Sequence, residues 1–209
     1  MNFLMNRPQP PAASILLAHG AGAPMDTPFM NAFAEGLCDK GLAVARFEFA
    51  YMSARRDGGP RKPPPRAERL HDEYRAAIAG LAEDLPLFIG GKSLGGRVAS
   101  MIAQEEYHAG RIAGLVCLGY PFHPPGKPER LRTAHLLELT APALIVQGER
   151  DPFGGMGEAK EYALSNTIGF HWAPDGDHDL KPRKSSGRTA QQNWLDAVDS
   201  ISLWVKSLV

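Results

Sequence analysis

The residues best placed to do chemistry are a serine among glycines, an acid after an apolar run, and a histidine near the carboxyl end. The serine is Ser93, in the pentapeptide Gly91–Gly95 (GKSLG), which follows the apolar run Leu87–Ile89 and precedes a helical pattern. A serine at such a strand-to-helix turn has a strained backbone that exposes its hydroxyl, and the flanking glycines avoid Cβ collisions. The pentapeptide predicts a nucleophile elbow, with the amide of Leu94 as an oxyanion donor.

The same peptide allows two other interpretations. It could be an incidental glycine-rich turn, or Gly91-Lys92-Ser93 could close a phosphate-binding loop. That loop has a glycine five residues before Gly91, where this chain has Pro86. The residues between them indicate a strand, whose N–H groups do not converge on a phosphate.

A loop of small residues follows the apolar run Ile15–Ala18 and reads His19-Gly20-Ala21-Gly22-Ala23. Small residues let backbone N–H groups approach a substrate oxygen, so Ala21 is the candidate for the second oxyanion donor, and His19 is a candidate brace for this loop. The alternative is a dinucleotide-binding turn, with Glu48 on the ribose. That fingerprint needs glycine or alanine where this chain has Met25.

Asp151 and His178 each follow a later apolar run. Asp151 lies in the turn after Leu144–Gln147, where a carboxylate can hold the Nδ1 proton of a histidine, although this fragment taken alone favours a structural Asx-Pro turn. His178 lies in the loop after Phe170–Trp172, whereas His171 lies inside that run and is expected to pack there. Three further acids near His178 are expected to be turn formers: Asp175, Asp177 and Asp179.

Short apolar runs alternate with helical patterns, which is typical of βαβ units in a mostly parallel sheet. The runs are nearly continuous, as expected for strands covered on both faces. We therefore expect a three-layer α/β fold of about six or seven strands in one domain over residues 1–209, with residues 1–13 extended. The strands that the pattern predicts are Ser14–Ala18, Leu42–Phe49, Leu85–Gly90, Ile112–Leu118, Pro142–Gln147 and Ile168–Trp172.

Capping signals and apolar stripes predict the helices that connect these strands. Thr27 and Pro28 open a helix that runs to about Lys40 and ends at Gly41. Thr189 is the expected cap of the last helix. Its apolar stripe consists of Trp194, Val198, Ile201, Val205 and Leu208. The other predicted helices are Ala67–Ala82, one that begins at Leu94, a short one around His135–Leu139, and Gly157–Ser165.

Two stretches, Ser53–Arg66 and Tyr120–Arg132, are rich in proline and glycine and are expected to lack secondary structure. Each follows a strand directly, so both should emerge at the face where open α/β sheets bind ligands. Many of their residues, and of those after His178, are basic, which favours anionic acyl substrates over neutral ones, with ordinary solvated loops as the alternative. These basic residues are Arg55, Arg56, Arg61, Lys62, Arg66, Lys127, Arg130, Arg132, Lys181, Arg183, Lys184 and Arg188.

Composition excludes several classes of protein. The chain has 209 residues, with 23 basic and 23 acidic side chains, and this balance argues against a dedicated binder of nucleic acids or membrane surfaces. Its amino-terminal residues do not form a secretory signal, and no apolar run is long enough to span a membrane. Cys38 and Cys117 lie in apolar segments, as free thiols do in a reducing compartment. We therefore expect a cytoplasmic protein.

The order of the fragments is more specific than any one of them. A small-residue loop, a serine elbow, an acid after a later strand and a histidine after the last strand is the chain order of the α/β-hydrolases. From about Ser14 onward the sequence resembles this superfamily, and most closely its small branch without a cap domain. That branch includes dienelactone hydrolases and relatives of the hydrolase-like subunit of a eukaryotic histone acetyltransferase complex.

The resemblance implies a nucleophile at Ser93, an acid at Asp151, a base at His178 and oxyanion donors at Leu94 and near Ala21. Dienelactone hydrolases carry cysteine as the nucleophile, which makes their substrate doubtful here. The interval between Leu118 and Pro142 is too short for a folded cap. Only thirteen residues precede Ser14, so the superfamily's amino-terminal antiparallel strands should be reduced or absent.

These observations predict a serine hydrolase that cleaves carboxylic esters or thioesters through an acyl-enzyme, with no metal or organic cofactor. The expected partner is a small-molecule substrate, with neither a nucleic acid nor a membrane. The alternative is a scaffold of the same fold that binds partners through its basic loops.

Overall fold

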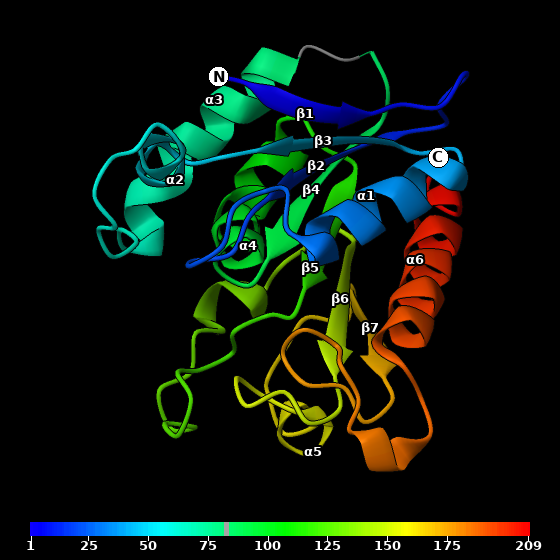
Figure 1. Ribbon diagram of the computed structural model, residues 1–209. Coiled ribbons are helices and arrows are strands. Elements are labelled where there is room, and N and C mark those ends of the chain that lie inside the picture. Colours follow the sequence, from blue (N-terminus) through cyan, green and yellow to red (C-terminus); the bar gives the residue numbers. More distant parts are fainter. Residues whose placement is uncertain (82–83) are drawn as a thin grey trace.

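Seven strands form a single sheet in the computed structural model, which describes residues 1–81 and 84–209 (Figure 1). The order across the sheet is β1-β3-β2-β4-β5-β6-β7, and β1 alone runs antiparallel to its neighbour. The strands are β1 (Phe3–Asn6), β2 (Ser14–Ala18), β3 (Ala43–Phe47), β4 (Leu87–Lys92), β5 (Gly114–Leu118), β6 (Ala143–Gly148) and β7 (Ile168–Ala173). The six predicted strands are therefore confirmed, as is the mostly parallel sheet.

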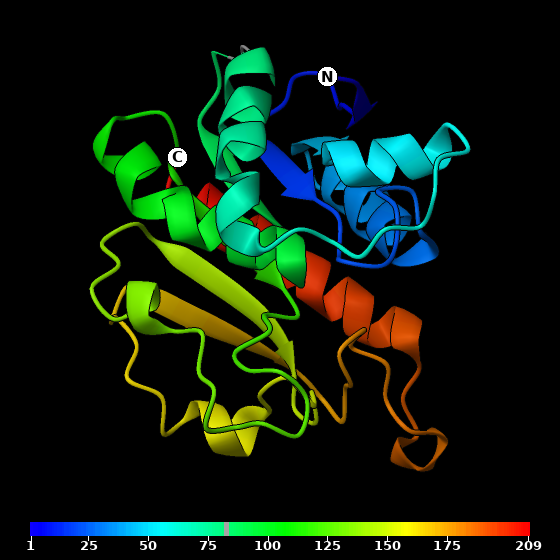
Figure 2. The same cartoon turned by 90° about the vertical axis from the view of Figure 1, so that its left-hand side faces the viewer.

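The helices lie in two layers, one on each face of the sheet (Figure 2). Helices α1 (Pro28–Asp39) and α6 (Ala190–Lys206) cover one face, and α3 (His71–Leu81) and α4 (Leu94–His108) cover the other. Alternate residues of a strand point to opposite faces. In β2, Leu16 packs with the α3 and α4 side, whereas Leu17 packs with the α1 and α6 side.

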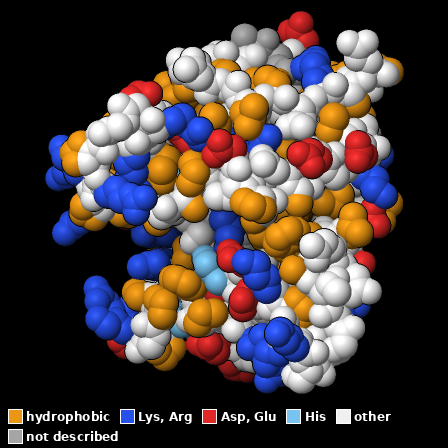
Figure 3. All heavy atoms as spheres, in the orientation of Figure 1, with side chains coloured by type: hydrophobic (Ala, Val, Ile, Leu, Met, Phe, Trp, Pro, Cys, Tyr) orange, Lys and Arg blue, Asp and Glu red, His pale blue; other side chains and the backbone are white. Residues whose placement is uncertain are grey.

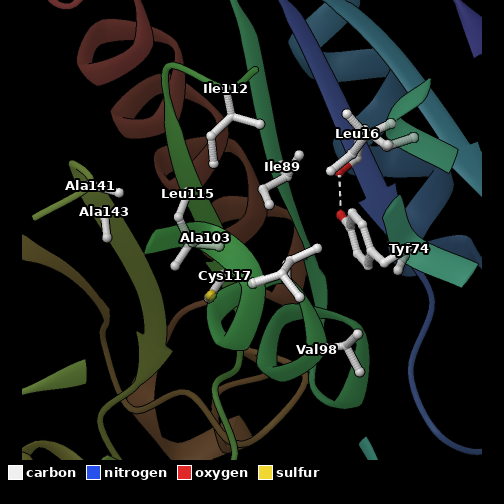
Figure 4. Packing of buried hydrophobic residues seen from close by; sticks show 14 of the residues in the cluster. Leu16, Tyr74, Ile89, Val98, Ala103, Ile112, Leu115, Cys117, Ala141 and Ala143 are labelled. Atoms are coloured by element: carbon white, nitrogen blue, oxygen red, sulfur yellow. Dashed lines mark hydrogen bonds between the residues drawn. The ribbon is translucent and has the colours of Figure 1, made fainter. Parts of the chain in front are cut away.

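One buried tyrosine ties α3 to two strands (Figure 4). The hydroxyl of Tyr74 lies 2.9 Å from the carbonyl oxygen of Leu16 in β2 and 2.6 Å from that of Gly90 in β4. The amide of Gly90 donates to the same hydroxyl at 2.9 Å. The hydrogen bonds therefore fix α3 at the centre of the sheet, next to the strand that carries the elbow.

The capping predictions are confirmed. Thr27 accepts a hydrogen bond from the amide of Met30, Pro28 begins α1, and Gly41 has a positive φ of 86° just after the helix. Thr189 forms a capping box with Gln192 at the start of α6. The shorter elements are α2 (Ala50–Arg56), α5 (Met156–Ala159) and the 3-10 helices η1 (Ala67–Leu70), η2 (Ala134–Leu136) and η3 (Lys184–Ser186).

Several element predictions were wrong or incomplete. The extended segment 1–13 contains β1, which pairs with β3 through main-chain bonds that its half-exposed side chains do not signal. Ser53–Arg66 is not free of secondary structure, because α2 covers its start and buries Met52. The helix predicted over Gly157–Ser165 ends at Ala159, and the amide of Ser165 donates to the Leu136 carbonyl at 3.0 Å and not within a helix.

Two helix ends also differ from the prediction. The segment that starts at Ala67 begins as the 3-10 helix η1 and continues as α3 to Leu81, and its predicted end at Ala82 lies outside the described residues. Helix α6 ends at Lys206, so Leu208 lies beyond the predicted apolar stripe and is exposed.

Candidate active site

Ser93 stands at a sharp turn between β4 and α4, as predicted. Its backbone has φ 50° and ψ −111°, a positive φ that is unusual for a residue with a side chain. The turn has no room for a Cβ on either flanking glycine, because an added Cβ would lie 2.3 Å from the carbonyl oxygen of Ala18 at Gly91 and 2.4 Å from it at Gly95. The strand-to-helix crossing therefore requires both glycines and presents the serine at the carboxyl end of β4.

The three side chains proposed for proton transfer lie in one chain of hydrogen bonds. His178 Nε2 is 2.9 Å from Ser93 Oγ, and His178 Nδ1 is 2.8 Å from Asp151 Oδ2. Since a carboxylate only accepts, Nδ1 carries the proton and Nε2 is free to accept the serine proton. Ser93 comes from the end of β4, Asp151 from the turn after β6, and His178 from the loop after β7.

The carboxylate of Asp151 is almost wholly buried and is held by groups other than the histidine. Its Oδ1 accepts the amide of Phe153 at 2.8 Å, and its Oδ2 also accepts Nε2 of Gln147 at 2.9 Å. Gln147 in turn accepts the amide of Tyr120 at 2.6 Å, which fastens the acid's turn to the loop after β5. Gln147 could not be identified from the sequence, because its partners are distant in sequence and it stands at the end of a predicted strand.

Lys92 holds the loop that carries the histidine. Its Nζ donates to the carbonyl oxygen of His178 and lies 3.4 Å from Asp179 Oδ1 and 5.3 Å from the centre of the Phe29 ring. Burial lowers the pKa of this ammonium. From the sequence, Lys92 was considered only as part of a phosphate-binding loop, the alternative that Pro86 argues against.

Helix α6 holds the same loop from the opposite side. The indole Nε1 of Trp194 donates to the Asp179 carbonyl at 2.9 Å. The amide nitrogen of the Asn193 side chain donates to the carbonyls of Pro174 and Leu180, at 3.0 and 2.8 Å. The histidine loop is therefore fixed by the elbow on one side and by the first turns of α6 on the other.

The small-residue loop after β2 lies beside the elbow. A Cβ added at Gly20 would be 3.9 Å from the Cβ of Ser93, and Ala21 lines the space in front of the serine. Buried His19 donates from Nδ1 to the Gly20 carbonyl at 2.6 Å and accepts the Phe49 amide at Nε2 at 3.2 Å. Tyr51 of α2, which the sequence analysis did not single out, donates to the Ala21 carbonyl at 3.1 Å. Both side chains brace the loop.

A second serine–histidine contact lies inside the protein. Ser100 Oγ is 2.8 Å from His135 Nε2, but its hydroxyl also donates to the Arg97 carbonyl at 2.7 Å and is almost fully buried. In the described part of the chain, no carboxylate makes a hydrogen bond to His135, whose pKa burial lowers to about 4. This pair lacks both the acid and the access that a nucleophile needs.

Two cavities meet at Ser93. The first, here called the apolar cavity, has a volume of about 390 Å³ and is lined mainly by apolar and small residues, among them Ala23, Pro24, Phe29, Met30 and Trp194. Its charged lining residues are Lys92, Asp179 and Lys181. The second, here called the arginine cavity, has a volume of about 490 Å³ and is lined by Arg66, Arg97, Arg132, Glu68 and Pro121. Ser93, Ala21 and Phe153 border both cavities, and Leu94 borders the second.

The basic residues predicted to line the site divide into two groups. Arg56 pairs with Asp26 and Glu48, so Glu48 does not stand free for a ribose; Arg183 pairs with Asp175. Of the others, Arg66 and Arg132 line the arginine cavity and Lys181 lines the apolar cavity. Figure 3 shows Lys and Arg side chains on both sides of a notch on the left of the molecule, between the segment after α2 and the loop after β5.

Two further residues that the sequence singled out have structural roles. His171 lies in β7 and is half-buried, as expected, and burial lowers its pKa. Asp177 accepts hydrogen bonds from the amides of Asp179 and Lys181, as a turn former does.

Over residues 1–81 and 84–209, no His, Cys, Asp and Glu side chains cluster in a way that could hold a metal ion. No helix in that same part of the chain is long and apolar enough to cross a membrane.

Comparison with known proteins agrees with this architecture. A family model described as an alpha/beta hydrolase domain matches residues 11–206. Dienelactone hydrolase from Anabaena variabilis superposes with a TM-score of 0.75 at 21% identity, over 99% of this chain and 91% of that one. A serine hydrolase without a lid from Xanthomonas campestris gives 0.67 at 17% identity, over 98% and 88%. An esterase domain from Rhodothermus marinus gives 0.68 at 18% identity, over 97% and 91%.

Proposed function

The chain belongs to the alpha/beta hydrolase domain family, and on that premise we propose that it is a serine hydrolase of carboxylic esters or thioesters. The single observation that carries this proposal is the hydrogen-bonded chain from Ser93 through His178 to Asp151. An ester substrate also agrees with the esterase domain among its structural neighbours. The strained backbone of the serine supports the same conclusion.

The proposed reaction begins with proton transfer. His178 Nε2 takes the proton of Ser93 Oγ as the oxygen attacks the substrate carbonyl, and the imidazolium that forms is stabilised by Asp151. The tetrahedral oxyanion accepts hydrogen bonds from the amides of Leu94 and Ala21. The first of these amides begins α4 and therefore has no acceptor within the helix.

The tetrahedral intermediate then collapses to an acyl-enzyme, which water hydrolyses in a second step. The bond to the alcohol or thiol breaks, and His178 returns its proton to the leaving group, which leaves an acyl ester on Ser93. Water, deprotonated by His178, attacks this ester, and the same proton is returned to the serine oxygen as the carboxylic acid departs. Every step uses groups of this chain and one water molecule.

The test is labelling and turnover in matched serine variants. We expect a fluorophosphonate to label the wild-type protein and Ser100→Ala, and not Ser93→Ala. Turnover of a short p-nitrophenyl ester should fall about 10⁴-fold or more in Ser93→Ala only. Loss of labelling in Ser100→Ala alone would move the nucleophile to the second serine–histidine pair. A folded wild-type protein that is neither labelled nor active would favour the scaffold alternative.

A further inference from the structure

The arginine cavity combines excess positive charge with direct access to the proposed nucleophile. Three arginines, Arg66, Arg97 and Arg132, line it together with one acidic residue, Glu68. Ser93 borders the same space. Like charges that share a confined space repel one another, so such a lining needs a compensating anion.

The pairing of these side chains compensates only part of that charge. Arg97 Nη2 contacts Glu68 Oε1 at 3.2 Å, but Arg97 Nε is buried and has no hydrogen-bond partner among the described residues. In the same described ranges, Arg132 forms no ion pair, and its pKa is lowered by burial and by the neighbouring charges of Arg97 and Arg130. Arg132 is held in place through its backbone, since its amide donates to the Phe122 carbonyl at 2.7 Å.

We infer that the arginine cavity binds an anionic group of the ester, a carboxylate or a phosphate, while the scissile carbonyl lies at Ser93. This inference rests on the proposed function and specifies its substrate class. The guanidinium groups offer forked donors that match either anion. The apolar cavity on the other side of Ser93, lined by Phe29, Met30 and Trp194, then takes the uncharged part of the molecule.

The three arginines of this cavity come from different parts of the chain. Arg66 and Arg132 belong to the two loops that were predicted to emerge at the ligand face. Arg97 was not among the residues singled out, although it follows Ser93 by four positions, one helical turn along α4. This spacing places its side chain on the same side of the helix as the elbow.

The experiment compares two esters that differ in charge and by one methyl group. Mono-p-nitrophenyl glutarate is the anionic probe, and its ω-methyl ester is the neutral one. We expect the wild-type protein at low salt to favour the anionic ester in kcat/KM by about tenfold or more. Arg132→Gln and Arg97→Gln should each lose most of that preference, measured as the ratio of kcat/KM for the anionic ester to kcat/KM for the neutral one.

The matched control is Arg130→Gln, which removes an equal charge two residues from Arg132 at an exposed position outside the cavity lining. It should keep the preference. Equal efficiency for the two esters in the wild-type protein, or a preference that Arg130→Gln reduces as much as Arg132→Gln does, would overturn the inference.

Two further measurements are needed. One distinguishes a carboxylate from a phosphate as the bound anion, and the other distinguishes failure of the anion site from failure of the proposed function. Glutarate and inorganic phosphate are each tested as inhibitors of neutral ester turnover; the stronger one identifies the anion, and inhibition by neither counts against the inference. If neither ester is hydrolysed, the proposed function fails. Calorimetry of both esters with Ser93→Ala then still decides the inference, because tighter binding of the anionic ester supports it and equal binding overturns it.

Discussion

Replacement of Lys92 by methionine should separate activity from stability. The substitution keeps most of the apolar stem and removes the ammonium, which lies over the Phe29 ring and ties the histidine loop to the elbow. The loop would then rely on α6 and on the bond to Asp151. A displacement of about 1 Å in the base is enough to lower turnover about 100-fold, so we expect kcat to fall by about 10-fold to 100-fold.

The effect on stability should be small because two contributions oppose each other. A hydrogen bond from a charged group is worth about 1.5–3 kcal/mol, but the buried ammonium also carries a desolvation penalty, which its lowered pKa reflects. The partner carboxylate of Asp179 is half-exposed and keeps Lys181 at 3.3 Å, so it is not left buried and unpaired. The net change should be within about 1 kcal/mol, or about 2–4 °C in Tm.

The assay measures kcat and KM on a short p-nitrophenyl ester, together with thermal unfolding of the same samples. Lys40→Met is the matched control, since Lys40 forms an exposed ion pair with Asp199 far from the site. It should leave both parameters within about twofold. A Lys92→Met protein with full activity, or one whose activity falls only in proportion to its unfolded fraction, would refute the positioning role.

The remaining predictions concern stability. Tyr74→Phe leaves the buried amide of Gly90 without the hydroxyl that accepts it, so the free energy of unfolding should fall by about 1–3 kcal/mol, measured by urea denaturation; an unchanged midpoint would contradict this. His135 has a pKa of about 4 in the folded protein, whereas an unfolded histidine titrates near about 6.5. The unfolded chain therefore binds more protons between these values, and stability should decrease as pH falls through this window. His135→Gln should flatten that part of the stability profile, and equal slopes in both proteins would show that another group is responsible.

The parts of the site that sequence could predict are those encoded by neighbouring residues. Gly91 and Gly95 flank Ser93 within one pentapeptide, so the elbow is visible without any knowledge of the fold. The positions of Asp151 and His178 follow from the order of parallel strands, because the carboxyl ends of such strands share one edge of the sheet. The central strands were recognisable because they are buried on both faces.

The parts that sequence could not predict depend on contacts between distant segments. Gln147 and Lys92 look like strand-end residues, and their roles come from partners in other loops. Strand β1 has two exposed and two half-buried residues in four, which is too short a pattern to show a period, and only its pairing with β3 defines it. Helix α2 is followed directly by a segment rich in prolines and glycines, and that composition hid the helix in the sequence.

The hydrogen bonds from α6 to the histidine loop give this helix a role in positioning His178, although no residue of α6 takes part in the proposed reaction. Asn193 and Trp194 hold three carbonyls of that loop, and both come after every other segment of the site in the chain. During synthesis the proposed site can therefore assemble only after residues 193 and 194 have emerged. In the folded protein, transient detachment of α6 would abolish the proposed ester hydrolysis while the sheet stayed intact.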